Sequence, residues 1–212
     1  RRDGDYLDGR HPLDVQYVKN PRTDCLRRDF TINALAYNEN EGVIDCVGGL
    51  DDIKNKVIRC VGEPEVRFKE DALRMLRAIR FSVVLGFEIE ERTKTAIKKY
   101  SILIKKVSAE RIREELEKIL RSENPGGIIM LHQLGLLKYI IPELDVCFSV
   151  NQRNKYHLYN VGEHIIHAVA KTPEDITIRW AALLHDIGKP LCKSVDANGI
   201  IHFYGHHHES VR

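Results

Sequence analysis

The chain has 212 residues, a length that accommodates one large domain or two small ones. Charged residues make up 30% of the sequence, but the formal net charge is only +2, so the overall composition does not indicate a basic nucleic-acid-binding field. No apolar run approaches the roughly 18 residues of a membrane span, and no signal peptide opens the chain, so we expect no membrane association.

The cysteines are odd in number and widely spaced, with no C-x-x-C pair among them. They are Cys25, Cys46, Cys60, Cys147 and Cys192. This usage is typical of reduced thiols in a cytosol and disfavours a disulfide framework or a zinc knuckle. We therefore expect a cytoplasmic protein.

The first part of the chain alternates short apolar stretches with turns. Residues 13–18 alternate apolar and polar side chains, as a half-buried strand does. In residues 24–37, two arginines and an acid precede a short stretch that we expect to be an apolar helix. We further expect a strand at 42–45, a helical turn at 50–55 and a strand at 57–61.

From residue 65 onward the apolar positions recur with a helical period. The expected helices cover 65–85, 90–100, 109–121 with Ser108 as N-cap, 127–137, 160–170 and 173–189. Pro142 interrupts this pattern, and residues 144–156 show no clear period, so we take them as the candidate linker. The fold class is therefore α+β and mostly α-helical.

Residues 70–80, EDALRMLRAIR, have two unlike faces when drawn as a helix. The apolar face carries Ala72, Met75, Leu76, Ile79 and Val83, and the polar face carries Glu70, Asp71, Arg74 and Arg77. With Arg80, the arginines follow one another at i, i+3 spacing, where like charges repel by a few tenths of a kcal/mol per pair. An anion lying along the stripe would relieve that repulsion.

The acid beside these arginines indicates which anion would fit. A carboxylate only accepts hydrogen bonds and a guanidinium only donates them. Asp71 and Arg74 side by side would therefore match a base edge that shows an amino group beside a ring-nitrogen acceptor, as cytosine and adenine do. A good bidentate pair discriminates between bases by roughly 1–3 kcal/mol, and Arg77 and Arg80 would remain for a triphosphate. The alternative is a surface helix with a local Asp71–Arg74 pair and a capping acid in its first turn.

Four motifs in the same order as in a known family extend this interpretation. They are RRDFTINALAY at 27–37, the acid- and glycine-containing stretch DCVGGLDD at 45–52, RCVG at 59–62 and Glu70-Asp71-x-x-Arg74. Together they resemble the class II tRNA nucleotidyltransferases, the CCA-adding enzymes, which are grouped with the bacterial poly(A) polymerases. The resemblance covers residues 1 to about 145.

In that family the last of these motifs is the protein template that selects CTP and ATP by their Watson–Crick edges. The resemblance implies that Asp71 and Arg74 read the base, that Arg28 contacts the nucleotide and that Asp29 lies at the ribose. The implied nucleotide-binding residues are Arg28, Asp29, Glu70, Asp71, Arg74, Arg77 and Arg80. The alternative for Arg27, Arg28 and Asp29 is an ion pair that caps a helix.

The chain departs from the family in its catalytic carboxylates. The family's metal-binding Asp-x-Asp pair and the glycine-rich turn for the triphosphate lie upstream of the residues present, so we expect a fragment truncated at both ends with no catalytic residue of its own. Nucleotidyl transfer depends on two Mg²⁺ ions held by carboxylates. Asp3, Asp5 and Asp8 fall where the family has a loop, and we interpret them as loop acids. Residues 1–212 alone are expected to add no nucleotide to tRNA with Mg²⁺ present.

A second group of chemistry-bearing side chains occupies residues 157–212. After His157 come His164 in the string NVGEH, the adjacent His185 and Asp186 in LLHDIGK, and His206 behind Gly205. This pattern resembles the HD phosphohydrolase domain. The resemblance implies a divalent metal that activates water, with His164, His185, Asp186 and His206 as ligands.

Two points about this metal site stay open in the sequence. His207 and His208 compete with His206 as ligands, and the family's closing aspartate would lie beyond Arg212. The alternative is that the histidines pack in an apolar core, in which case the buried polar pair in LLHDIGK would need other partners.

The resemblances together predict three parts of the chain. Residues 1–62 would be the C-terminal part of a nucleotidyltransferase head, 63–145 a helical neck and body for nucleotide selection and RNA binding, and 150–212 an incomplete HD domain. The implied function is the addition of C and A to tRNA 3′ ends from CTP and ATP with Mg²⁺. Basic residues between Lys98 and Arg121 would meet tRNA phosphates, although a solvated helix face would also account for several of them.

Other functions remain compatible with the sequence. A poly(A) polymerase or an enzyme that adds only the final A would share the same fold. A second alternative is a metal phosphohydrolase in which the HD domain carries the activity and the front half binds RNA. A third is a non-catalytic RNA-binding protein. The sequence indicates neither an oligomeric state nor the metal that an HD site would prefer.

Overall fold

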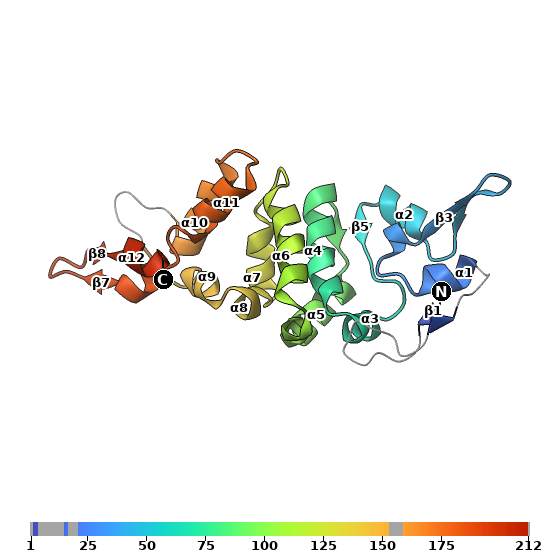
Figure 1. Cartoon of the computed structure of the whole chain (residues 1–212), viewed down its shortest axis with the longest axis horizontal. Helices are drawn as coiled ribbons and strands as arrows, with labels where there is room; N and C mark the ends of the chain where they lie inside the picture. Colours follow the sequence, from blue (N-terminus) through green and yellow to red (C-terminus); the bar gives the residue numbers. More distant parts are fainter. Residues whose placement is uncertain (1, 4–14, 17–20, 153–158, 212) are drawn as a thin grey trace. The chain divides into compact units, whose positions relative to one another are not determined.

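The computed structural model describes residues 2–3, 15–16, 21–152 and 159–211 (Figure 1). The chain divides into two compact units, residues 1–115 and 116–212, and each is described by itself. The predicted domain boundaries near residues 62 and 145–150 differ from this division and stay a prediction. Of the expected strand at 13–18, only Val15–Gln16 (β2) belongs to the described residues, and it pairs antiparallel with Arg2–Asp3 (β1).

The segment around the RRDFTINALAY motif is not the apolar helix expected there. Helix α1 spans Pro21–Leu26, Thr31–Asn33 form a short 3₁₀ turn, and Leu35–Asn38 form strand β3. Strand β3 pairs antiparallel with β4, Gly42–Asp45, in the register Leu35↔Asp45 to Asn38↔Gly42. The expected helix was wrong because strand β4, which begins just after the hairpin turn, supplies the backbone hydrogen bonds of β3.

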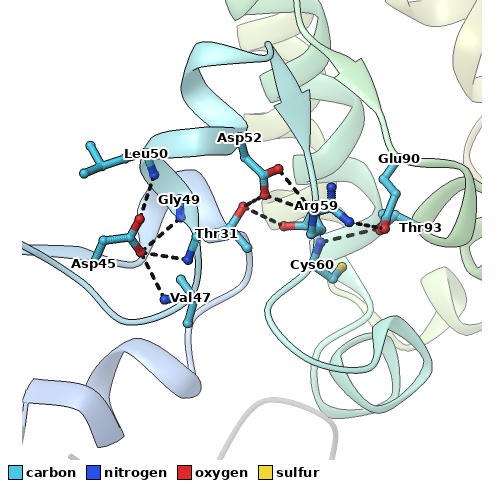
Figure 2. Close-up of polar contacts among 11 residues, drawn as sticks. Thr31, Asp45, Val47, Gly49, Leu50, Asp52, Arg59, Cys60, Glu90 and Thr93 are labelled. Atoms are coloured by element: carbon cyan, nitrogen blue, oxygen red, sulfur yellow. Dashed lines mark hydrogen bonds and ion pairs between the residues drawn. The ribbon is translucent and has the colours of Figure 1, made fainter.

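Strand β4 leads into helix α2, Gly49–Lys54, through a turn organised by one carboxylate. Oδ1 of Asp45 accepts hydrogen bonds from the N–H groups of Val47, Gly48 and Gly49, and Oδ2 accepts one from Leu50 (Figure 2). Gly48 has φ of +78°, and a Cβ on Gly49 would lie 2.2 Å from the carbonyl oxygen of Thr31, so both positions require glycine. The strand at 42–45 and the helical turn at 50–55 are thus confirmed.

The Asp45 turn makes stability depend on pH in the acid range. Partial burial opposes the charged carboxylate, but the four N–H donors outweigh it and lower the pKa of Asp45. Because the folded-state pKa lies below the unfolded value of about 3.9, the stabilisation is fully present above that pH and is lost as the pH falls through the folded-state pKa. Asp45→Ala is expected to lower the free energy of unfolding at pH 7 by roughly 0.5–2 kcal/mol, as loss of a helix cap does.

Chemical denaturation of both variants between pH 7 and pH 2 measures this prediction. The difference between the wild type and Asp45→Ala should shrink steadily toward the acid end. A difference that stays constant across this range would show that the Asp45 charge does not stabilise the turn. The matched control is Asp51→Ala, which removes an exposed carboxylate from helix α2, the helix that follows the Asp45 turn.

The rest of the first unit is mostly helical, with one pair of short strands. Its elements are β5 (Val57–Ile58), α3 (Pro64–Glu70), α4 (Leu73–Leu85), β6 (Glu88–Ile89), α5 (Glu91–Tyr100), a 3₁₀ segment (Ser101–Lys106) and the start of α6 (Ala109–Leu120). Strands β5 and β6 pair in parallel, so the expected strand at 57–61 is real but shorter. The helices expected at 90–100 and 109–121 are confirmed within one residue at each end.

The single helix expected at 65–85 is interrupted. Asp71 adopts an extended backbone, with φ of −148° and ψ of 106°, and separates α3 from α4. The Asp71 carboxylate accepts a hydrogen bond from the N–H of Leu73, two residues on, and so competes with helix continuation. The apolar face is confirmed, since Ala72, Met75, Leu76 and Ile79 are buried, although Val83 is only partly so.

The second unit contains six further helices in the described part of the chain. They are α7 (Gly127–Gln133), α8 (Leu137–Ile140), α9 (Pro142–Cys147), α10 (Val161–Ala170), α11 (Ile176–Leu184) and α12 (His206–Val211). A 3₁₀ turn at Lys189–Cys192 and the antiparallel pair β7 (Ser194–Val195) and β8 (Ile201–His202) precede α12. No helix among the described residues is long and apolar enough to cross a membrane.

Three expectations for this unit need correction. The helix expected at 127–137 ends at Gln133, because Gly135 takes a positive φ of 74° and a new helix follows. Pro142 does not end the helical pattern but occupies the first turn of α9, where its missing N–H costs nothing, so the candidate linker at 144–156 begins inside a helix. The helix expected at 173–189 ends earlier, at Leu184.

Helix α10 begins within one residue of where the sequence predicts, directly after Asn160. Asn160 and Glu163 form a reciprocal capping box: the Asn160 side chain accepts from the N–H of Glu163, and the Glu163 carboxylate accepts from the N–H of Asn160. The α+β, mostly helical fold class is confirmed for the described residues.

Candidate nucleotide pocket and candidate metal cluster

An open pocket of about 470 Å³ lies in the first unit. It is lined by three segments far apart in the sequence, namely the residues after α1, the stretch from Asp71 into α4, and one residue of α6. The lining residues are Arg27, Arg28, Asp29, Asn33, Asp71, Arg74, Arg77 and Arg111. Five arginines against two aspartates give the lining a positive formal charge, which suits an anionic ligand.

The arginines after α1 are held by an acid from the same helix. Both Arg27 and Arg28 form ion pairs with Asp24, and Nη1 of Arg28 donates a 2.9 Å hydrogen bond to the carbonyl of Asn33. Burial opposes ionisation of Asp24, but the bonds from both guanidinium groups outweigh it and lower the pKa of Asp24. The Arg28 side chain keeps 43% of its surface exposed, so it is free to meet a ligand while its position is fixed.

Asp29 turns toward α4. Its Oδ2 accepts bonds from Nε and Nη2 of Arg77, both at 2.7 Å, and its Oδ1 accepts one from the N–H of Phe30. The sequence left open a helix-capping ion pair among Arg27, Arg28 and Asp29. In the structure the two arginines pair with Asp24, and Asp29 pairs with Arg77. The carboxylate oxygens of Asp29 both serve protein donors in this arrangement.

The segment that carries Asp29 is anchored by a chain of polar contacts (Figure 2). The N–H of Thr31 donates to the carbonyl of Arg59, and the Thr31 hydroxyl donates to Oδ2 of Asp52 at 2.6 Å. Arg59 bonds Asp52 through Nε and Glu90 through Nη1, the latter at 2.6 Å. These contacts join the 3₁₀ turn, α2, the residue after β5 and the residue before α5, so they connect the segment after α1 to the helical part of the unit.

Glu70 and Asp71 have different partners on the two sides of the helix break. Glu70 pairs with Arg74 at 2.6 Å and with Arg67 at 2.7 Å. Asp71 pairs with Arg111, whose Nη2 lies 2.7 Å from Oδ2 and whose Nη1 lies 3.3 Å from Oδ1. The local Asp71–Arg74 pair of the surface-helix alternative is thus replaced by two separate pairs.

Arg74 keeps donors available for a ligand. A guanidinium carries five N–H donors. Nη1 of Arg74 donates to Glu70 and to the carbonyl of Arg67, and Nη2 donates to the carbonyl of Arg27 at 3.4 Å. Within the part of the chain that the structure describes, the Nε–H and one N–H of Nη2 remain at the pocket lining.

Arg80 and Glu70, both predicted as nucleotide-binding residues, do not belong to the pocket lining. Nε of Arg80 lies 2.7 Å from Oε2 of the buried Glu115, and its guanidinium lies 3.8 Å from the centre of the Phe81 ring. Burial lowers the pKa of Arg80. All three arginines lie in α4, where each step of three residues turns the side chain by about 60° around the helix axis, so Arg74 and Arg77 reach the pocket and Arg80 faces Glu115 of α6.

The predictions did not include three of the lining residues as nucleotide-binding residues. Arg27 and Asn33 belong to the RRDFTINALAY motif, which the sequence had already indicated as a nucleotide-binding segment through Arg28 and Asp29. Arg111 comes from α6, 40 residues beyond its partner Asp71, and was counted only in the basic run from Lys98 to Arg121. No local pattern signals such a pairing, because it exists only once the helices have packed.

The pocket carboxylates are poor candidates for a divalent cation. Asp29 and Asp71 each engage an arginine through short bonds, and the surrounding charge is positive. The residues of this pocket therefore do not fit the Mg²⁺ expected for nucleotidyl transfer.

A separate cluster of histidines and one aspartate lies in the second unit. His164 comes from α10, His185 and Asp186 directly follow α11, and candidate ligand atoms of the three lie within 4.8 Å of one another. Oδ2 of Asp186 is 3.5 Å from Nε2 of His164 and 3.1 Å from Nε2 of His185, and Oδ1 is 3.2 Å from Nε2 of His206. His206 is thus the member of the triple histidine that joins Asp186, while His157 lies outside the described residues.

The chemistry of this donor set fits a divalent transition metal. Nδ1 of His185 donates to the carbonyl of Ala182 and Nδ1 of His206 to that of Phe203, both at 2.7 Å. This arrangement leaves Nε2 of each ring directed at Asp186, as in histidines oriented for metal ligation.

The buried carboxylate at the centre of the cluster also has a cationic neighbour. Nζ of Lys189 lies 2.6 Å from Oδ2 of Asp186 and 3.2 Å from Oε1 of Gln152. Burial opposes ionisation of Asp186, but the bonds from His185 and Lys189 outweigh it and lower the pKa of Asp186. The bond to Asp186 in turn raises the pKa of His185.

Comparison with known proteins finds similarity to one family. Residues 1–59 match the model described as the poly A polymerase head domain, and residues 86–148 match the probable RNA and SrmB-binding site of polymerase A. A CCA-adding enzyme of Pediococcus pentosaceus is 42% identical over 159 residues, which are 74% of this chain and 40% of that enzyme. An A-adding tRNA nucleotidyltransferase of Deinococcus radiodurans is 38% identical over 204 residues, 91% of this chain and 46% of that enzyme.

A solved structure agrees with these matches. The Bacillus stearothermophilus CCA-adding enzyme in complex with CTP superposes with a TM-score of 0.58 at 34% identity, covering 83% of this chain and 40% of that one. These matches support the class II tRNA nucleotidyltransferase family as the one that the chain resembles. The chain spans less than half the length of each of these relatives.

Proposed function

We propose that the chain is the nucleotide-selecting part of a tRNA nucleotidyltransferase that adds C and A to tRNA 3′ ends. The observation that carries the proposal is the meeting of Asp71 and Arg74 at the lining of one arginine-rich pocket. In this assignment the pocket takes CTP or ATP, Asp71 and Arg74 read the base, and Arg28 and Arg77 meet the phosphates. Asp29 acts through Arg77, which it holds.

The base-reading step rests on hydrogen-bond polarity. Asp71 accepts a bond from the exocyclic amino group of cytosine or adenine, and a free N–H of Arg74 donates to the adjacent ring nitrogen. Uracil and guanine present a carbonyl oxygen and a ring N–H at the same positions, so each contact would set donor against donor or acceptor against acceptor. Discrimination follows from the unpaired polar groups that the wrong base leaves.

Other features of the proposal follow the same resemblance. Residues 1–62 form the end of the head, 63–145 the neck and body that bind RNA, and tRNA phosphates meet the basic residues between Lys98 and Arg121. The Mg²⁺ ions of the transfer step are held in the whole protein by an Asp-x-Asp pair that the resemblance places outside these residues. The protein works in the cytoplasm.

Two experiments test the proposed function. Equilibrium binding of CTP, ATP, UTP and GTP to the chain should show the first two bound more tightly, by roughly 5- to 150-fold, the range equivalent to 1–3 kcal/mol. The whole protein, incubated with Mg²⁺, all four nucleotides and a tRNA that lacks its last three residues, should yield 3′ ends reading C, C, A. Equal affinity for all four nucleotides would contradict the assignment of the pocket.

The same end sequencing separates related activities. The Deinococcus radiodurans relative, which matches 91% of this chain, is an A-adding enzyme. Ends that gain only a final A, and only on a tRNA already carrying C, C, would assign that activity instead. A run of A on any tRNA would indicate a poly(A) polymerase.

We also propose a divalent metal site at His164, His185, Asp186 and His206, in an HD domain over residues 150–212. The supporting observation is the convergence of three imidazole Nε2 atoms on one buried carboxylate. A metal bound there would activate a water molecule for attack on a phosphate ester. The chain's own residues orient the rings through the carbonyls of Ala182 and Phe203, and Lys189 supplies a positive charge beside the carboxylate.

A further inference from the structure

The carboxylate of Asp71 has most of its acceptor capacity already in use. A carboxylate offers about four lone-pair sites. Oδ1 accepts from the N–H of Leu73 at 3.1 Å and from Nη1 of Arg111 at 3.3 Å, and Oδ2 accepts from Nη2 of Arg111 at 2.7 Å. Among the described residues, this leaves one acceptor site, on Oδ2.

Arg111 supplies two of those three bonds and approaches from a different element. Its planar fork bonds both oxygens of Asp71 at once, which fixes the rotation of the carboxylate as well as its position. Asp71 itself lies in extended backbone between two helices, with its N–H bonded to the carbonyl of Arg67 and its carbonyl bonded to the N–H of Arg74. The rotation of its carboxylate is therefore set by the bonds that the two carboxylate oxygens accept. The Arg111 and Asp71 side chains are each 22% exposed, so the pair sits at the pocket wall and not in bulk solvent.

We propose that Arg111 is a positioning residue that determines base specificity through Asp71. It holds the Asp71 carboxylate so that one oxygen faces the pocket as a single acceptor, ready for one amino N–H of cytosine or adenine. This inference rests on the proposed function, because it assigns to Arg111 the orientation of the group that reads the base. Arg111 itself does not contact the base in this assignment.

The geometry explains why a single acceptor is the useful arrangement. A freely rotating carboxylate offers either oxygen in several directions and can also accept the ring N–H of guanine or uracil. A carboxylate locked by the guanidinium fork offers its remaining lone pair in one direction only, beside the free N–H groups of Arg74. The same paired charge keeps Asp71 from turning to Arg74 and closing the pocket with a local ion pair.

Lysine is not equivalent to arginine at this position. An ammonium group is a point charge with rotatable donors and cannot form the two parallel bonds of the guanidinium fork. Arg111→Lys is therefore expected to retain the charge near Asp71 but to lose the fixed rotation of its carboxylate. Arg111→Ala loses both the charge and the orientation.

The test is the selectivity of nucleotide binding, measured on the full 212-residue chain. Titrations with CTP and UTP give the ratio of their dissociation constants, and a titration with inorganic triphosphate measures the anion site without a base. In Arg111→Ala the ratio should fall to near one, while the affinity for triphosphate should change by less than about threefold. Arg111→Lys should have an intermediate ratio, because only the charge is rescued.

A matched control removes a different arginine–carboxylate pair. Nη2 of Arg92 pairs with Glu63 at 2.8 Å, with both side chains more than half exposed and neither at the pocket lining. Arg92→Ala should keep the wild-type CTP to UTP ratio. Thermal unfolding of all variants separates a loss of stability from a loss of selectivity, and Arg111→Lys keeps the test valid where Arg111→Ala fails to fold.

The possible outcomes are distinct. A wild-type chain that binds CTP and UTP equally would contradict the proposed function, and the inference about Arg111 would fall with it. A selective wild type with an equally selective Arg111→Lys would overturn the inference alone. A uniform loss of affinity for CTP, UTP and triphosphate in Arg111→Lys would also overturn it, because that pattern indicates a direct phosphate contact.

Discussion

Asp71→Ala is expected to abolish the preference for CTP and ATP over UTP and GTP. The substitution removes the only acceptor assigned to the exocyclic amino group, and it leaves Arg111 at the pocket wall without its partner. The wild-type selectivity of roughly 5- to 150-fold should fall to near one. The affinity for triphosphate should not fall, because one negative charge has been removed from an already positive pocket.

Fluorescence or calorimetric titrations with the four nucleotides measure this result. Asp71→Asn gives the sharper comparison, since an amide keeps the size of the side chain but can both donate and accept. It should bind UTP at least as well as the wild type does. Asp51→Ala, at an exposed position of α2, should keep the wild-type preference. An Asp71→Ala chain with undiminished selectivity would show that the base is read elsewhere.

Asp186→Asn is expected to remove stabilisation by divalent metal from the second unit. The substitution removes the charged carboxylate on which three imidazoles converge, while keeping its shape. A metal that binds only the folded state at 100 times its dissociation constant stabilises by about 2.7 kcal/mol. At roughly 2–4 °C per kcal/mol for a chain of this size, the wild-type Tm should rise by about 5–11 °C on addition of metal.

Thermal unfolding with and without Mn²⁺, Ni²⁺ or Zn²⁺ measures the shift, and calorimetry measures the stoichiometry. Asp186→Asn should show little or no shift with any of them. Asp196→Asn is the matched control, because Asp196 also pairs with a histidine, His202, at 3.0 Å in the same unit but outside the cluster. A wild-type Tm that does not change with any of these metals would contradict the metal site, and the histidines would then only pair with Asp186.

The helix break at Asp71 shows how tertiary contacts override a periodic pattern. The apolar positions of residues 70–80 are buried as a helical period requires, so the pattern predicted which face packs. It did not predict the interruption, where the Asp71 carboxylate accepts a bond from the N–H of Leu73 that competes with helix continuation and also pairs with Arg111, 40 residues away. The separation of Asp71 and Arg111 in the sequence explains why Arg111 was not predicted as a pocket residue. Arg80 pairs with Glu115 outside the pocket lining, and its predicted contact with the nucleotide stays a prediction.

Residues 30–38 illustrate a second limit. LAYN at 35–38 is as compatible with a helix as with a strand in isolation, and β3 exists because β4 pairs with it. Pro142 is the converse case, since proline is equally typical of the end of one helix and of the first turn of the next. In both cases the local sequence permits two structures and the packing partner selects one.

The sequence by itself determined the mostly helical fold class, indicated a resemblance to one family through its ordered motifs, and predicted a group of candidate nucleotide- and metal-binding side chains. Capping at Asn160 and Glu163 and the turn at Asp45 were also local matters, because their hydrogen bonds join residues at most five apart. Only the tertiary structure decided which of the arginines share a pocket, which carboxylate each of them holds, and which of three adjacent histidines meets Asp186. The physical reason is that ion pairs and ligand clusters depend on distances in space, which a linear pattern constrains only over a few residues.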